Sequence, residues 1–150
     1  MEIYNNGSKI YIGSAISIED FLKLHPDISY RRENLEVKYT QRELDAIKKE
    51  KIDSVKIDTE TTISGNTYSV LRTDILKYKE AIDISTLLGF STVKLSLKNG
   101  VVELNLSDAN DVIKILSEIA LTNFWKKHDF SLLVNSKDSF DEIQSLPSTL

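Results

Sequence analysis

The alternation of hydrophobic and polar positions is clearest between residues 93 and 106. Apolar and polar side chains alternate in Val93–Leu97 and again in Val101–Leu106, and Lys98–Gly100 separates the two runs. A period of two is typical of β-strands with one buried face, and an Asn-Gly pair favours a tight turn between such strands. The pattern therefore predicts a hairpin whose connection lies in solvent, with a positive φ at Gly100.

Shorter β-like runs occur nearer the N-terminus. The sequence NNGS separates the first two runs, and a Gly-centred turn at Gly65 separates another pair. Turn residues of these types tolerate positive φ, which favours hairpins at both places. In the second hairpin we expect the ring of Tyr68 to pack beneath the corner that leads into the next helix. The predicted strands are Glu2–Tyr4, Lys9–Ile12, Leu35–Tyr39, Thr61–Ile63 and Thr67–Val70.

Helices are predicted where apolar positions recur every three or four residues after a polar capping residue. The expected starts are Ser17 or Asp20 for a helix that Pro26 stops, Thr40 with Glu43 for a helix from Gln41, Thr73 or Asp74 for a helix that ends at Gly89, Ser107 or Asp108 for a long helix, and Ser139 with Glu142 for a short one that Pro147 limits. The expected buried positions are Leu44, Ile47, Ile52 and Val55 in the second helix, Ile75, Tyr78, Ile82 and Leu88 in the third, and Val112, Ile113, Leu116, Ile119 and Ala120 in the long helix.

These elements predict an α+β fold, in which short antiparallel β-hairpins pack against several helices and a long helix lies near the C-terminus. We expect a small hairpin-and-helix lead-in over residues 1–39, an α+β domain over residues 40–146 and a flexible tail over residues 147–150. A chain of 150 residues can bury roughly 70% of its unfolded surface, so a hydrophobic core can form without disulfides. The chain contains no cysteine.

The charge and the hydropathy of the chain exclude several kinds of partner. The net charge is −4 and the lysines and arginines form no long basic block, which argues against nucleic acid as the principal partner. No apolar stretch approaches the ~20 residues that a membrane helix requires, so we expect no membrane partner. The first residues, MEIYNNGSKIYIG, lack the basic start and long apolar run of a secretory signal peptide.

The sequence predicts no catalytic, cofactor-binding or metal-binding site. His25 and His128 are the only histidines, and a zinc site needs more nitrogen or sulfur ligands. The stretch SDAND resembles the start of a calcium loop, but Ile119 stands where that loop needs an acid. No nucleophile elbow or Gly-rich phosphate loop is present. The remaining candidates are acidic pairs at predicted helix starts, where negative charge favours the helix dipole: Glu19 with Asp20, and Asp141 with Glu142.

One pattern on the long helix points to a partner. Four residues at spacings of four, three and four lie about 180° from Val112 and Phe130 on a helical wheel. If the helix is straight, they form a second apolar stripe for a protein partner or for self-association. If the helix bends or restarts near Asp129, the same side chains rotate back into one core. The four residues are Leu121, Trp125, His128 and Leu132.

The order of these elements resembles the uncharacterised domain of bacteriophage and prophage tail proteins, a group that includes tail-fibre and tail-fibre-assembly-like proteins. The resemblance covers about Thr40–Leu146. It rests on a helix followed by a Gly-centred turn and an aromatic residue, and on an Asn-Gly hairpin followed by a leucine-containing strand. The matching residues are Gly65, Tyr68, Asn99, Gly100, Leu104 and Leu106. The chain departs from the family at Leu71, where an aspartate is common, and at Thr92 and Val93, where a tryptophan is common.

The resemblance implies a non-enzymatic tail accessory protein that acts in tail-fibre assembly or is a minor component of the tail. Its implied partners are a tail-fibre protein or a second copy of the chain. Its implied location is the bacterial cytoplasm during assembly, or the virion tail. Two other classes stay open: a small interaction or adaptor module unrelated to particle assembly, and an enzyme with a site built from scattered carboxylates, which no motif supports.

Overall fold

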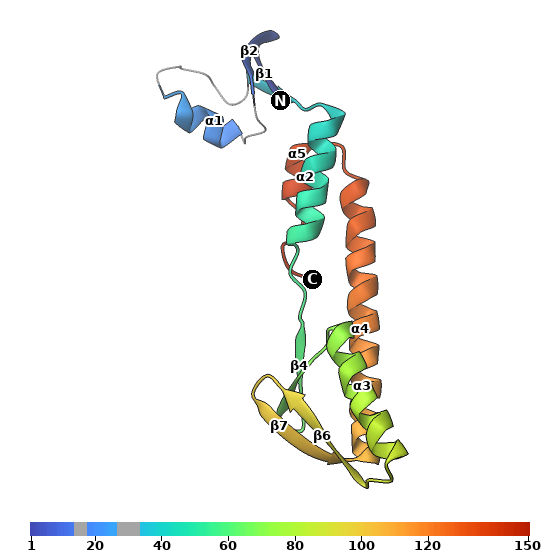
Figure 1. The fold of residues 1–150 in the computed structure, drawn as a ribbon. Helices are drawn as coiled ribbons and strands as arrows, with labels where there is room; N and C mark the ends of the chain where they lie inside the picture. Colours follow the sequence, from blue (N-terminus) through green and yellow to red (C-terminus); the bar gives the residue numbers. More distant parts are fainter. Residues whose placement is uncertain (14–17, 27–33) are drawn as a thin grey trace. The chain divides into compact units, whose positions relative to one another are not determined.

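The computed structural model describes residues 1–13, 18–26 and 34–150 and confirms the α+β fold (Figure 1). Helices alternate with short antiparallel strand pairs, and the longest helix follows the last hairpin. The elements are β1 (Glu2–Asn5), β2 (Ser8–Ile12), α1 (Ile18–Leu24), β3 (Leu35–Lys38), α2 (Gln41–Ser54), β4 (Glu60–Ile63), β5 (Asn66–Ser69), α3 (Arg72–Leu87), β6 (Thr92–Leu97), β7 (Gly100–Asn105), α4 (Leu106–Asn135) and α5 (Phe140–Gln144).

The chain forms two compact units. The first unit comprises Met1–Ser54 with Leu133–Pro147, and the second unit comprises Val55–Leu132 with Ser148–Leu150. This grouping differs from the division at residues 39 and 40 that the sequence suggested, because α2 packs with α5 in the first unit. The α+β domain over residues 40–146 stays a prediction.

The first unit contains a three-stranded antiparallel sheet in the order β2-β1-β3. The turn between β1 and β2 has positive φ at Asn6 and Gly7, as the NNGS sequence predicts. The side chains of Met1, Ile3 and Phe21 form its buried cluster. Ser17, one of the two residues predicted to begin α1, lies outside the described residues.

The start of α2 at Gln41 confirms the predicted capping box. The hydroxyl of Thr40 accepts a hydrogen bond from the Glu43 N–H, and the Glu43 carboxylate accepts one from the Thr40 N–H. The same carboxylate pairs with the amino group of Met1. This amino group and then the Thr40 N–H lower the pKa of Glu43 from an ordinary 4.5 to about 2.

We expect this carboxylate to make the stability of the first unit depend on pH. Because the pKa of Glu43 is lower in the folded protein, its contribution is complete above about pH 4.5 and is lost as the pH falls toward 2. Glu43→Gln should be less stable at pH 6 and should lose less stability between pH 4.5 and 2. Unfolding followed by circular dichroism at several pH values measures both effects. Parallel pH profiles for the two proteins would contradict the prediction.

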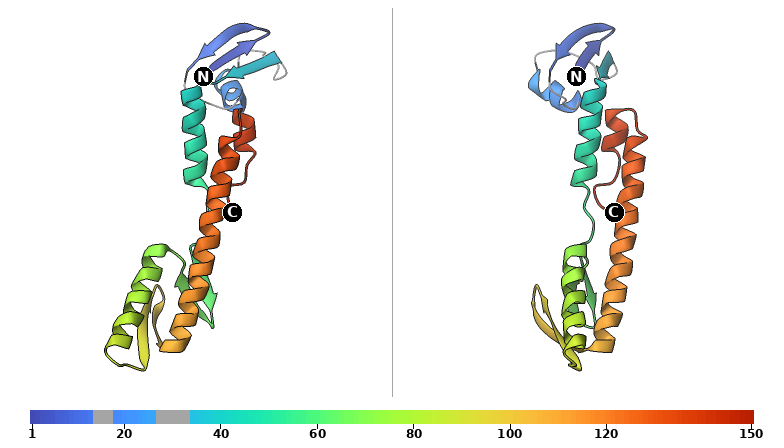
Figure 2. Two further views of the ribbon diagram at one scale, coloured as in Figure 1. Left: turned by 90° about the vertical axis from the view of Figure 1, so that its right-hand side faces the viewer. Right: turned by 45° about the vertical axis from the view of Figure 1, so that its right-hand side comes forward.

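The second unit contains two hairpins, β4–β5 and β6–β7, each a separate two-stranded sheet. Hairpin β6–β7 lies beside α3, as both views in Figure 2 show. The buried side chains come from both hairpins, α3 and α4. They are Tyr68, Val70, Ile75, Tyr78, Ile82, Val93, Leu95, Ala109, Val112 and Leu116.

Both turns of the second unit have the predicted backbone. Ser64 and Gly65 have φ of 49° and 81°, which favours the right-handed twist of the β4–β5 hairpin. In the other hairpin Gly100 has a φ of 136° and pairs with Leu97. Lys98–Gly100 is exposed, so the prediction of a solvent connection is confirmed.

Two predicted helix starts are wrong by a few residues. Helix α3 begins at Arg72 after Leu71, and no side chain caps it. The carboxylate of Asp74, a predicted cap, instead pairs with Lys77 at 2.9 Å. Helix α4 begins at Leu106 and not after Ser107 or Asp108, because the Asn105 side chain at the end of β7 accepts a hydrogen bond from the Asp108 N–H.

The end of α3 follows the prediction at Gly89, which has a φ of 75°. The Gly89 N–H donates to the Thr86 carbonyl and the Phe90 N–H to the Ser85 carbonyl, which is the Schellman pattern. Leu88, predicted as a buried position, is exposed because it is the capping residue beyond the helix.

Candidate functional site

Helix α4 passes through Asp129 without a break. It extends from Leu106 to Asn135 as one α-helix. The interpretation in which the helix restarts near Asp129 is therefore wrong. A continuous helix keeps residues that are 180° apart on opposite faces, and Val112 and Phe130 are both buried on one of them.

The opposite face carries a group of exposed apolar and aromatic side chains. The exposed fractions are 58% for Leu121, 61% for Phe124, 52% for Trp125 and 58% for Leu132. His128 is also exposed. We call these five residues the α4 aromatic surface. It contains all four predicted partner-binding residues, which α4 brings together along about three turns.

The three rings of this surface contact one another. The ring centroids of Trp125 lie 5.3 Å from Phe124 and 5.5 Å from His128, both edge to face. Phe124 and His128 stack with a centroid distance of 6.4 Å. Such ring pairs restrict the side-chain rotamers, so less conformational entropy would be lost when a partner covers them.

Phe124 is the member that the sequence analysis missed. It lies three residues after Leu121 and four before His128, which is the spacing of neighbours on one helix face. That spacing alone is sufficient to place Phe124 on the same face of the helix as Leu121 and His128. The predicted stripe used only one residue per turn, whereas an apolar face is wide enough for two.

Asn123 is a polar residue on the side of α4 that faces the core, and it makes a hydrogen bond there. Its side-chain amide donates a hydrogen bond to the Asp58 carbonyl, with a distance of 2.9 Å. Asp58 precedes β4, so this bond ties α4 to the start of the first hairpin in the second unit. The amide is thus satisfied within the protein and does not contribute to the α4 aromatic surface.

The polar residues considered for metal binding or catalysis contribute to local structure. His25 packs its ring 4.7 Å from that of Phe21. Asp108 accepts a hydrogen bond from the Asn105 amide at 2.7 Å. Glu142 completes the capping box of α5 with Ser139. The Ser139 hydroxyl also donates a hydrogen bond to the Glu142 carboxylate, which lowers the pKa of Glu142.

Among the residues that the structure describes, no group of three or more His, Cys, Asp or Glu side chains could hold a metal ion. Within those residues, no helix combines the length and the apolar character that crossing a bilayer requires.

Comparison of the chain with family models, with curated proteins and with solved structures gives no match.

Proposed function

We propose that this protein is a non-enzymatic accessory protein of a bacteriophage or prophage tail and that it acts through protein–protein contacts. The α4 aromatic surface is the observation that carries the binding role. Aromatic side chains are enriched where proteins bind each other, and a contiguous exposed apolar group on a small domain is uncommon without a partner. The resemblance over Thr40–Leu146 supports the assignment to a tail.

The proposed partner is a tail-fibre protein, which this chain binds during fibre assembly or in the finished tail. The bacterial cytoplasm during assembly, or the virion, is the corresponding location. The alternative is an adaptor module unrelated to particle assembly. A tail-fibre gene beside the gene for this chain would favour the assembly role, and its absence would favour the adaptor.

Trp125→Ala should weaken association by at least about 10-fold without unfolding the protein. The indole is half exposed, so truncation removes contact area for a partner and leaves the core intact. Binding is measured by titration with the neighbouring tail-fibre protein, and self-association by light scattering over a range of concentrations. Thermal melting followed by circular dichroism reports whether the variant is folded.

The matched control compares two exposed leucines of the second unit. Leu121→Ala lies on the α4 aromatic surface and should weaken association, whereas Leu87→Ala lies on α3, is more exposed and should not. Unchanged affinity in folded Trp125→Ala and Leu121→Ala would reject this surface. If the tail-fibre protein binds neither the unchanged chain nor the variants, the tail role is rejected.

A further inference from the structure

The edge of β6 that faces away from β7 has main-chain groups without a strand partner. Only two residues separate Leu97 from its partner Gly100, so this pair exchanges the hydrogen bonds nearest the turn. The alternation of an antiparallel ladder then directs the N–H and C=O groups of Lys94 and Ser96 to the outer edge. Among the described strands β6 pairs with β7 alone. The outer edge of β6 therefore has no strand partner among the described strands, and residues of β5 lie near β6.

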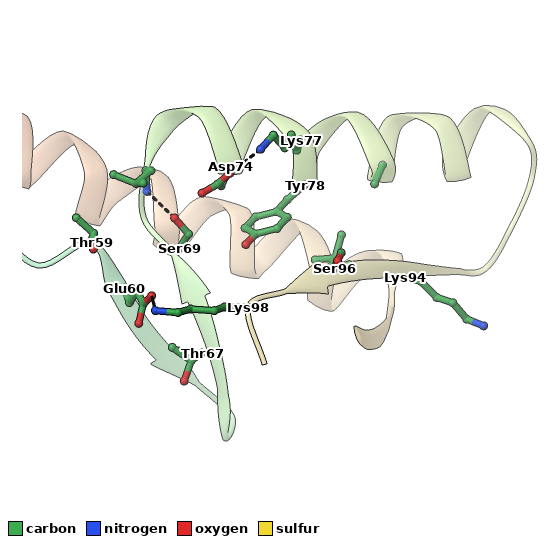
Figure 3. Close-up of a pocket in the computed structure, with 13 residues that line it drawn as sticks. Thr59, Glu60, Thr67, Ser69, Asp74, Lys77, Tyr78, Lys94, Ser96 and Lys98 are labelled. Atoms are coloured by element: carbon green, nitrogen blue, oxygen red, sulfur yellow. Dashed lines mark hydrogen bonds and ion pairs between the residues drawn. The ribbon is translucent and has the colours of Figure 1, made fainter. Parts of the chain in front are cut away.

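A groove follows this edge. It is bounded by β6, by α3 and, in the first cavity, by Glu60, Thr67 and Ser69 of the β4–β5 hairpin. Two cavities of about 580 and 540 Å³ adjoin there and share Ala81 of α3 and Lys94 of β6 in their linings. Figure 3 shows the first cavity, with Tyr78 on α3 and with Lys94 and Ser96 on β6. We call the two cavities together the β6–α3 groove. It extends beside the whole strand, since Thr92 lines one end and Lys98 the other.

Exposed apolar side chains lie at both ends of the β6–α3 groove. Leu71 lines the first cavity, and Ile84 and Phe90 line the second. Each is about half exposed. An occupant of the groove would remove this apolar area from water, which favours binding in addition to any hydrogen bonds with the strand edge.

The lysines of the groove are already paired with acids. Figure 3 shows Lys98 paired with Glu60 and Lys77 paired with Asp74. Each pair has an N–O distance of 2.9 Å. Lys94 lies 3.8 Å from Glu103 on β7, and both side chains are exposed. The groove therefore has no strong preference for a charged occupant.

Two features that often protect an edge strand, a bulge and a proline, are missing from β6. Native edges are often closed by a bulge, a proline or a free lysine. The pairing of β6 with β7 continues from Thr92 to Leu97 without the register shift that a bulge produces. The pairing of β1 with β2 does contain such a shift. No proline occurs in β6, and its lysine is paired.

We propose that the β6–α3 groove binds an extended peptide segment of a partner protein, which adds to β6 as a further strand. The outer edge of β6 offers main-chain donors and acceptors at every second residue, and these are complementary to the backbone of another extended segment. A helix would not bind in this way, because its main-chain donors and acceptors already bond to each other within the helix. The segment's alternate apolar side chains cover Leu71, Ile84 and Phe90. This proposal does not rest on the α4 aromatic surface.

The test measures amide hydrogen exchange by NMR with the blocked peptide N-acetyl-TVTVTVT-amide as the probe. The amides of Lys94 and Ser96 should exchange rapidly in the free protein and should slow at least about 10-fold when the peptide is in excess over its dissociation constant. The amides of Val93 and Leu95 already bond to β7 and should change little. No slowing at Lys94 and Ser96 with peptide on the order of 1 mM would overturn the proposal.

Two N-methylated forms of the peptide separate strand addition from simple apolar binding. One form carries methyl groups on the odd-numbered amides and the other on the even-numbered amides, so each loses the donors of one edge. Strand addition requires that one form binds like the parent peptide and that the other loses binding at least about 10-fold. Equal binding by both forms would overturn the proposal.

Two variants of the protein complete the test. Ser96→Pro removes an outward N–H and leaves the β6–β7 ladder, because Ser96 and Val101 form a pair that exchanges no hydrogen bonds. It should abolish binding, whereas Ser96→Ala should retain it. If Ser96→Pro does not fold, the N-methylated peptides decide on the unchanged protein. Protection of Lys94 and Ser96 without peptide, together with a doubled mass at high concentration, would assign this edge to a second copy and overturn the proposal.

Discussion

Tyr68→Ala should lower the free energy of unfolding of the second unit by about 3 kcal/mol. The Tyr68 side chain is 1% exposed, and truncating a buried aromatic residue removes its transfer free energy and leaves a cavity. The ring lies edge to face with Tyr78 at a centroid distance of 6.4 Å, and this contact is lost as well. Urea denaturation followed by the fluorescence of Trp125, the only tryptophan of the chain, measures the change.

Tyr68→Phe is the matched control, because it removes the hydroxyl and keeps the ring. The phenol of a tyrosine is neutral at neutral pH, and burial raises the pKa of Tyr68 further. The hydroxyl makes no hydrogen bond within the described part of the chain, so its loss should cost less than about 1 kcal/mol. Stability like that of the unchanged protein in Tyr68→Ala would show that the ring does not support the core.

Leu116→Ala should also destabilise the second unit by about 3 kcal/mol. Leu116 is 0% exposed and lies on the buried side of α4 among side chains from both hairpins and α3. Removal of a buried leucine side chain costs about 2–5 kcal/mol, according to how far the surroundings relax. The same urea denaturation measures the loss.

Leu121→Ala makes the same chemical change on the other face of the same helix. Leu121 is 58% exposed, so its replacement should change stability by less than about 1 kcal/mol. The two variants thus differ in how deeply the replaced leucine is buried, whereas the residue type and the helix are the same. An equal loss of stability in both variants would mean that the α4 aromatic surface is covered within the monomer, and would contradict the binding role.

Local chemistry determined much of the second unit in advance. The hairpins β4–β5 and β6–β7 were predicted because their turns need positive φ, which Gly65 and Gly100 adopt without strain from a side chain. The end of α3 was predicted because Gly89 closes a Schellman motif with neighbouring carbonyls. Each of these features depends on atoms a few residues apart, so a short stretch of sequence carries the information.

The candidate site was predicted only in part. The spacing of Leu121, Trp125, His128 and Leu132 placed them on one face, but it left open whether the helix continues past Asp129. The structure decided that point with a helix from Leu106 to Asn135. Their role in binding a partner stays a prediction.

Tertiary contacts decided the remaining features. Helix α4 begins at Leu106 because the side chain at the end of β7 caps it, which depends on where the hairpin ends. The first unit groups Met1–Ser54 with Leu133–Pro147, which lie far apart in the sequence. The groove beside β6 forms because the chain turns back after α3 and places β6 next to that helix. Periodicity within one element identifies its apolar face, but it contains no information about which other element covers that face or leaves its edge open. Local sequence therefore specified the type and order of the elements and their turns. The packing of those elements decided two helix starts and which surfaces and which strand edge stay exposed.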